Sequence, residues 1–158
     1  MRVGFGYDSH RFGDEPHAVQ KLGGVAVENC PKLVAHSDGD AVIHAVVDAL
    51  LGAAALGNVG EHFPDSDPRW KGADSAALLE QVVAELAANG WRVVNVDVAI
   101  VCEKPKIAPY AAAMSARLAE ILRVGAGDVS VKGKTNEKMD AVGAGLGIEV
   151  HCVALIDR

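Results

Sequence analysis

Apolar residues fill the segment from Ala41 to Leu56 almost without interruption, and this pattern predicts a buried helix. The polar residues Asp40, His44 and Asp48 recur at intervals of four and therefore share one stripe of that helix. Burying unpaired charge costs several kcal/mol. The stripe therefore needs a compensating partner, and a bound metal ion is the natural candidate.

The rest of the chain shows alternating strand and helix patterns. Val3, Phe5 and Tyr7 alternate with polar or small residues and predict a strand, and a hairpin is expected around Gly23 and Gly24. We predict further helices over Ala73–Asn89 and Ala108–Val124, strands over Arg92–Cys102, Asp128–Thr135 and Ile148–Ile156, and loops over 58–72 and Val142–Gly147. This order predicts one α/β (α+β) sandwich domain over residues 1–158, in which helices cover a four- to five-stranded sheet.

Two polar residues on a valine-rich strand indicate an oligomer. Asn95 and Asp97 lie on one face of the strand predicted over Arg92–Cys102. Aromatic residues make up only 4% of the sequence, so the core is built from small aliphatic side chains. We expect the second face of this mostly apolar sheet to pack against other subunits.

Charge and cysteine content narrow the class of protein. A net charge of −6 argues against general binding of nucleic acid or anionic membranes, although lysines or metal ions would still allow a phosphorylated substrate. The three cysteines are widely separated, which is typical of reduced thiols in a cytosolic protein. The sequence shows no signal-peptide pattern and no uninterrupted membrane-length apolar run, and we expect a cytoplasmic location.

A metal site is predicted from three residues. Asp8 and His10 are two positions apart on a strand and leave the same face. With His44 they supply one oxygen and two nitrogen ligands and leave a fourth position open, which is typical of a catalytic zinc site. The alternative is a surface aspartate and a histidine that caps a turn. Asp40 and Asp48 would orient the metal ligands or hold substrate hydroxyls. The alternative for Asp40 is a carboxylate in the first turn of the helix, where the helix dipole favours negative charge.

Three further segments carry candidate chemistry. His36 and Ser37 precede a helix N-terminus, which attracts anions, although simple capping is the alternative for Ser37. The loop from Phe63 to Pro68 is too irregular and hydrophobic for a linker and indicates a functional loop. Lysines cluster at 104–106 and 132–138, where Thr135 and Glu137 suit a phosphate held with a second divalent ion. The alternative there is a solvated polar loop.

These motifs together resemble the 2-C-methyl-D-erythritol 2,4-cyclodiphosphate synthase family over essentially the whole chain. The similar segments are RVGFGYDSHRF, AHSDGDAVIHAVVDALLGAAALG, FPDSDPRWKGADS, NVDVAIVCEKPKIAPY and VKGKTNEKM. The resemblance implies a homotrimer in which mixed sheets, each covered on one face by three helices, pack about a threefold axis. It also implies active sites between neighbouring subunits.

The resemblance implies a lyase of the non-mevalonate isoprenoid pathway. Such an enzyme converts 4-diphosphocytidyl-2-C-methyl-D-erythritol 2-phosphate to 2-C-methyl-D-erythritol 2,4-cyclodiphosphate and releases CMP. The 2-phosphate of the substrate attacks its own β-phosphorus, so the step is an intramolecular phosphoryl transfer. Two competing hypotheses are a zinc-dependent phosphohydrolase and a non-catalytic trimeric module that binds cytidine nucleotides.

The resemblance also assigns roles to individual residues. Asp8, His10 and His44 would bind one Zn²⁺ per subunit, Glu137 would bind Mg²⁺ or Mn²⁺ with the substrate, and His36 and Thr135 would stabilise transition-state charge. His36, Ser37 and the loop 63–67 would contact the methylerythritol phosphate portion of the substrate. Segments 102–108 and 134–137 of the adjacent subunit would form the pocket for cytosine and its phosphates. The full set of expected substrate contacts is Asp8, Ser9, His10, His36, Ser37, Asp40, Asp48, Asn58, Val59, Gly60, Phe63, Pro64, Asp65, Ser66, Asp67, Cys102, Glu103, Lys104, Pro105, Lys106, Ile107, Ala108, Lys134, Thr135, Asn136 and Glu137.

Two positions depart from the family pattern. Asn58 stands where many members have aspartate, so an oxygen acceptor is kept without its charge. Ala141 and Ala144 stand where many members have phenylalanine and arginine near the trimer axis. We therefore do not expect the isoprenoid diphosphate site that some members carry there, while the catalytic set is unchanged.

Overall fold

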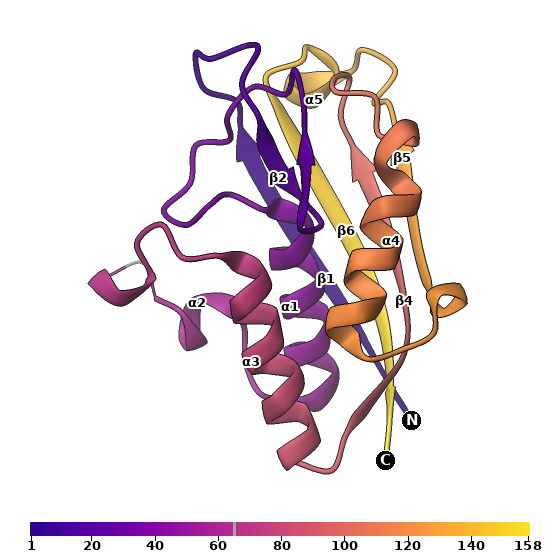
Figure 1. Ribbon diagram of the computed structural model, residues 1–158. Coiled ribbons are helices and arrows are strands. Elements are labelled where there is room, and N and C mark those ends of the chain that lie inside the picture. Colours follow the sequence, from indigo (N-terminus) through magenta and orange to yellow (C-terminus); the bar gives the residue numbers. More distant parts are fainter. Residues whose placement is uncertain (65) are drawn as a thin grey trace.

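The computed structural model describes residues 1–64 and 66–158, and its centre is a mixed sheet (Figure 1). The strands of this sheet are β1 (Arg2–Arg11), β4 (Arg92–Val101), β5 (Val129–Lys134) and β6 (Gly147–Asp157). Their order is β1-β6-β4-β5, with β6 antiparallel to both neighbours and β5 parallel to β4. The predicted mixed sheet is confirmed, with four strands.

The expected hairpin forms a separate two-stranded sheet. It consists of β2 (Gln20–Leu22) and β3 (Val25–Val27), which pair antiparallel across Gly23 and Gly24. Both glycines have positive φ, 60° and 73°, which the tight turn requires and which glycine adopts without steric cost.

Three long helices cover one face of the main sheet (Figure 1). They are α1 (Ala41–Ala54), α3 (Ser75–Ala88) and α4 (Ala108–Leu122). Helix α1 packs directly on β1. The contact is so close that a Cβ atom added to Gly4 or Gly6 would lie 1.9 Å from a carbonyl oxygen of the helix. The glycines that alternate with Val3 and Phe5 therefore allow this close approach. It brings the polar stripe of α1 next to β1.

Three short helical turns lie within or next to the two predicted loops, 58–72 and 142–147. They are α2 (Val59–His62), the 3₁₀ turn η1 (Pro68–Trp70) and α5 (Asp140–Gly143), and a further 3₁₀ turn, η2 (Ala126–Asp128), precedes β5. Side-chain caps start two of them: Asn58 accepts from the Glu61 N–H, and Asp67 accepts from the Arg69 N–H. A single turn is too short to show helical periodicity, so the sequence pattern did not reveal these elements.

The face of the sheet opposite the helices exposes apolar side chains. Val3, Phe5 and Tyr7 of β1 are 68%, 61% and 44% exposed, and Val153 of β6, which pairs with Phe5, is 45% exposed. Asp97 of β4 lies opposite Val153 in the register. Exposed apolar side chains that form a contiguous patch typically mark an interface. Within the described residues, no helix combines the length and the apolar character needed to span a membrane.

Candidate active site

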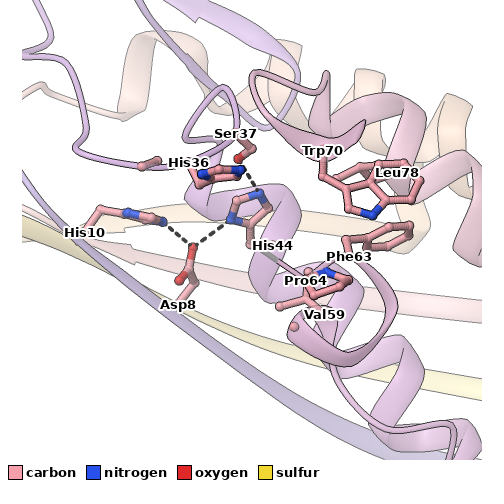
Figure 2. A pocket seen from close by; sticks show the side chains of 12 residues that line it. Asp8, His10, His36, Ser37, His44, Val59, Phe63, Pro64, Trp70 and Leu78 are labelled. Atoms are coloured by element: carbon pink, nitrogen blue, oxygen red, sulfur yellow. Dashed lines mark hydrogen bonds and ion pairs between the residues drawn. The ribbon is translucent and has the colours of Figure 1, made fainter. Parts of the chain in front are cut away.

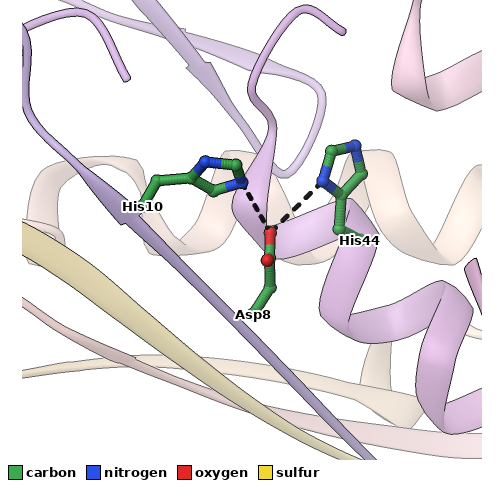
Figure 3. Close-up of side chains that lie close together, drawn as sticks. All are labelled: Asp8, His10 and His44. Carbon is green, nitrogen blue, oxygen red and sulfur yellow. Dashed lines mark hydrogen bonds and ion pairs between the residues drawn. The ribbon is translucent and has the colours of Figure 1, made fainter. Parts of the chain in front are cut away.

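Three predicted ligands meet between β1 and α1 (Figure 3). Oδ2 of Asp8 lies 3.0 Å from Nε2 of His10 and 3.2 Å from Nδ1 of His44. One donor atom from each residue falls within 4.8 Å of the others. Asp8 and His10 point the same way because they are two residues apart on a strand, and His44 reaches them from the stripe of α1.

Hydrogen bonds behind the two imidazoles determine which ring nitrogen faces Asp8. Nδ1 of His10 lies 3.0 Å from the Val34 carbonyl oxygen, which can only accept, so Nδ1 carries a proton and Nε2 is the nitrogen that faces Asp8. Nε2 of His44 lies 3.0 Å from Oγ of Ser75. Since Ser75 Oγ–H donates to Oδ1 of Asp38, Oγ accepts from His44 Nε2–H, and Nδ1 is the nitrogen that faces Asp8.

The charges of this cluster suit a divalent cation. Burial raises the pKa of Asp8, but hydrogen bonds and charge from His10 and His44 outweigh burial and bring the pKa below its ordinary value. The site therefore gathers an ionised carboxylate and two imidazole nitrogens at one point, and a bound cation would replace the protons that these nitrogens share with Asp8. This donor set fits Zn²⁺, and within the described residues the group has three members, so a coordination position is left for a further ligand.

Ser75 and Asp38 were not predicted as part of the site. Ser75 is fully buried at the start of α3, where its N–H also donates to Oδ2 of Asp38. Ser37 Oγ lies 3.2 Å from the same nitrogen of His44. Such partners hold a metal-binding histidine in one orientation and tautomer. A serine and an aspartate near a helix start are typical helix caps, so their residue types and positions do not indicate this role.

The three ligands open into a cavity of about 310 Å³ (Figure 2). Phe63 and Trp70 form its apolar end, with their rings in an edge-to-face arrangement 5.0 Å apart. Nε2 of His36 and Nε1 of Trp70 are buried without a hydrogen-bond partner among the described residues, so both are available to a bound molecule. The lining residues are Asp8, His10, Ala35, His36, Ser37, His44, Val59, Gly60, Phe63, Pro64, Trp70 and Leu78.

The cavity thus contains many of the predicted contacts to the methylerythritol phosphate part of the substrate. His36, Ser37, Phe63 and Pro64 line it, and so do Val59 and Gly60, which were expected among the substrate contacts in general. Trp70, the last residue of η1, and Leu78 of α3 were missed, because an apolar side chain in a loop or an amphipathic helix gives no chemical sign that it contacts a ligand. Among the other predicted contacts, Asp65 lies outside the described residues, Ser66 is exposed, and Asp67 pairs with Arg69 at 2.6 Å.

The other two members of the polar stripe have structural partners. Asp40 is fully buried, and its carboxylate accepts hydrogen bonds from the N–H groups of Gly23, Gly24 and Ile43. It caps α1 and fastens the hairpin to it. Asp40 thus acts at the start of the helix, as in the alternative of a first-turn carboxylate, although it is the N-cap and precedes the first turn. Oδ1 of Asp48 accepts from the Val59 N–H at 2.8 Å and so holds α2, which borders the cavity.

A second pocket of about 230 Å³ lies where β4 and β5 end. It is formed by two segments predicted to bind cytosine and its phosphates, and its lining residues are Cys102, Pro105, Lys106, Ile107, Ala108, Gly133, Lys134 and Thr135. Glu103, Lys104, Asn136 and Glu137 do not line it. Oγ1 of Thr135 instead donates to Oε1 of Glu137 at 2.8 Å.

The two pockets belong to opposite edges of the sheet. β1 carries Asp8 and His10 at one edge, and Thr135 follows β5 at the other, with β6 and β4 between them (Figure 1). Three strand spacings of about 4.8 Å separate the edge strands by roughly 14 Å. His36 and Thr135, which are both expected to stabilise transition-state charge, therefore belong to separate pockets at opposite edges of the sheet.

These features define an α+β protein with an aspartate and two histidines gathered at the mouth of a cavity at a sheet edge. The YgbB family model matches residues 1–157, and the chain belongs to the YgbB family. Curated relatives of the chain are named 2-C-methyl-D-erythritol 2,4-cyclodiphosphate synthase. The relative from Pseudomonas paraeruginosa is 54% identical over 99% of this chain and 98% of its own, and that from Dechloromonas aromatica is 50% identical over 100% and 98%.

Solved structures share the fold. A structure described as 2C-methyl-D-erythritol-2,4-cyclodiphosphate synthase in a CDP-bound form has a TM-score of 0.89 and 33% identity, and the match covers 99% of this chain and 100% of that one. The bifunctional IspDF of Campylobacter jejuni matches with a TM-score of 0.92 and 35% identity over 98% of this chain, which corresponds to 42% of the longer protein. The resemblance drawn from sequence motifs is confirmed.

Proposed function

We propose that this protein converts 4-diphosphocytidyl-2-C-methyl-D-erythritol 2-phosphate to 2-C-methyl-D-erythritol 2,4-cyclodiphosphate and CMP. The observation that carries the proposal is the cavity in which Asp8, His10 and His44 converge beside His36. The family and the names of the curated relatives support the same reaction. The protein would be a lyase in isoprenoid precursor synthesis.

The proposed reaction depends mainly on how the substrate phosphates are positioned and how their negative charge is neutralised. An oxygen of the 2-phosphate forms a bond to the β-phosphorus, the bond from that phosphorus to the CMP oxygen breaks, and CMP leaves with the electron pair. Phosphoryl transfer needs little covalent help from side chains, so orientation and neutralisation of charge supply most of the rate enhancement. No covalent intermediate with the protein is required, because the nucleophile belongs to the substrate.

The residues divide into a metal-binding set and a set that contacts the substrate directly. Asp8, His10 and His44 would hold Zn²⁺, and Glu137 would hold Mg²⁺ or Mn²⁺ together with the substrate. When bound, these ions supply positive charge to the phosphate oxygens, which a chain of net charge −6 otherwise lacks. His36, whose Nε2 has no hydrogen-bond partner among the described residues, and Thr135 would stabilise charge on the transferred group.

We further propose a homotrimer in which neighbouring subunits share each active site. The separation of the two pockets at opposite sheet edges supports this, because a partner's strand-end pocket would complete the cavity of the first chain. The exposed Val3, Phe5 and Val153 give the uncovered sheet face an apolar surface for packing about a threefold axis. The acidic net charge and the three buried free cysteines accord with a cytoplasmic enzyme that binds neither nucleic acid nor membranes.

The direct test follows the phosphorus nuclei of the diphosphocytidyl substrate by NMR in the presence of Mg²⁺. We expect CMP and a cyclic diphosphate in equal amounts. Inorganic phosphate as a product would instead show a phosphohydrolase, and tight cytidine nucleotide binding without turnover would show a binding module. Either result would refute the proposal.

A histidine substitution tests the ligand assignment. His44→Ala removes one of three ligands, so we expect loss of bound zinc and of nearly all activity while the oligomer persists. His17→Ala is the matched control, because His17 is exposed in the turn before β2. Full zinc occupancy in His44→Ala, measured by atomic emission after gel filtration, would show that the assignment is wrong.

A further inference from the structure

The loop that follows β5 has an unusual backbone. Glu137, Lys138 and Asp140 have φ angles of 50°, 63° and 53°, which non-glycine residues rarely adopt because Cβ approaches the backbone. The same loop carries Thr135 and Glu137, to which the proposed function gives a charge-stabilising and a metal-binding role. A backbone held in this conformation needs compensating contacts, and these identify what positions the two residues.

Glu103 supplies such a contact from outside the loop. It follows β4 closely, and its Oε1 accepts a hydrogen bond from the N–H of Asn136 at 3.0 Å and a longer one from the N–H of Lys138 at 3.4 Å. The Cys102 N–H donates to the Lys134 carbonyl oxygen at 3.0 Å, so the two segments are joined immediately before Glu103 and immediately before the loop. Residues in the left-handed conformation turn successive N–H groups toward one point, where an anion is favourable.

The far side of the loop is held by its own side chains. Nδ2 of Asn136 donates to the Met139 carbonyl oxygen at 3.1 Å and to Oδ2 of Asp140 at 2.8 Å. Gly143 of α5 packs against the loop so closely that a Cβ there would lie 2.3 Å from the Lys138 carbonyl carbon. The loop is thus fixed at Asn136 and Lys138, the two residues that flank Glu137.

We propose that Glu103 is a positioning residue: its carboxylate fixes the loop that presents Thr135 and Glu137, and it does not contact the substrate. This replaces the substrate contact expected for Glu103 from the resemblance. Glu103 is absent from the lining of the strand-end pocket, although its neighbours Cys102 and Pro105 line it. The assignment of a catalytic purpose to the loop rests on the proposed function, whereas the anchoring itself does not.

Amide hydrogen exchange tests the anchoring without any substrate. In Glu103→Ala we expect exchange at the Asn136 and Lys138 amides to be faster by at least about tenfold, because their acceptor is lost. Glu103→Gln keeps an oxygen acceptor, and we expect exchange within about threefold of the original chain. Glu80→Ala removes an exposed carboxylate from α3 as a control. Unchanged protection in Glu103→Ala would overturn the proposal.

Kinetics test what the anchoring is for. We expect Glu103→Ala to lower kcat by about 10- to 100-fold, to raise the Mg²⁺ concentration that gives half-maximal rate, and to leave bound zinc unchanged, while Glu103→Gln recovers most of the rate. A raised KM with unchanged kcat in both variants would indicate direct substrate contact and overturn the proposal. If the original chain does not turn over the substrate, the proposed function fails, and the exchange experiment still decides the anchoring.

Discussion

The hydrogen bond from His44 to Ser75 offers a quantitative test of the metal site. Ser75→Ala removes the hydroxyl that lies 3.0 Å from Nε2 of His44 and that donates to Asp38. Ser75 is fully buried, so water does not readily replace the lost oxygen. His44 Nε2–H then retains only Ser37 Oγ, at 3.2 Å, as an acceptor.

The size of the effect follows from these contacts. Substitutions of residues that support a metal ligand typically weaken metal affinity by about 10- to 100-fold. Because Ser37 partly replaces Ser75, we expect the lower end for Ser75→Ala, about tenfold or about 1.4 kcal/mol. Replacing both serines by alanine leaves no hydroxyl at either position, and we expect a loss of about 100-fold.

The assay is competition for Zn²⁺ against a chromophoric chelator at constant pH. Ser115→Ala, a serine-to-alanine change on α4, serves as the control, and thermal unfolding of each metal-free variant checks that the fold is intact. Zinc affinity within twofold of the original chain in both the single and the double variant would refute the reasoning. It would show that neither serine orients His44.

Three further predictions address packing, thiol chemistry and assembly. Gly6→Ala forces a Cβ to 1.9 Å from the Ala45 carbonyl oxygen, and urea titrations should show a free energy of unfolding that is lower by about 3 kcal/mol or more. The control Gly127→Ala, whose Cβ would have nothing within 4 Å, should leave the free energy of unfolding nearly unchanged. Burial raises the pKa of Cys30 to about 11 and the pKa values of Cys102 and Cys152 to about 12, so the thiols stay protonated at pH 8. They should resist iodoacetamide until the protein is unfolded, and rapid labelling of the native protein would contradict this expectation. Phe5→Glu places charge on the exposed sheet face, and light scattering should show dissociated subunits rather than trimers.

The element types were largely predictable because periodicity is a local property of the chain. The helix over Ala41–Ala54 and the strand over Arg92–Val101 lie close to their predicted ranges. The helix ends two residues earlier than predicted, since Ala55 adopts φ 58°. The single-turn helices were not predictable in this way, because four residues do not complete a hydrophobic repeat.

The three candidate metal ligands could be predicted from the sequence, whereas most of the residues that surround and orient them could not. Asp8 and His10 share a strand face by spacing alone, and the cost of a buried imidazole at His44 pointed to the same cluster. The polar stripe was an ambiguous signal, however, because any buried carboxylate needs partners of some kind. For Asp40 these partners are backbone N–H groups of a hairpin, whose approach no local pattern encodes.

By itself, the sequence determined the long helices and strands, the three candidate metal ligands and the family, because each depends on residue types at short, fixed spacings. Only the tertiary structure decided where these parts lie. The strand order places the metal ligands and Thr135 at opposite sheet edges, and the packing of α3 against α1 brings Ser75 to His44. Strand order and helix packing arise from contacts between residues far apart in the chain, and such contacts leave no periodic trace in the segments that make them.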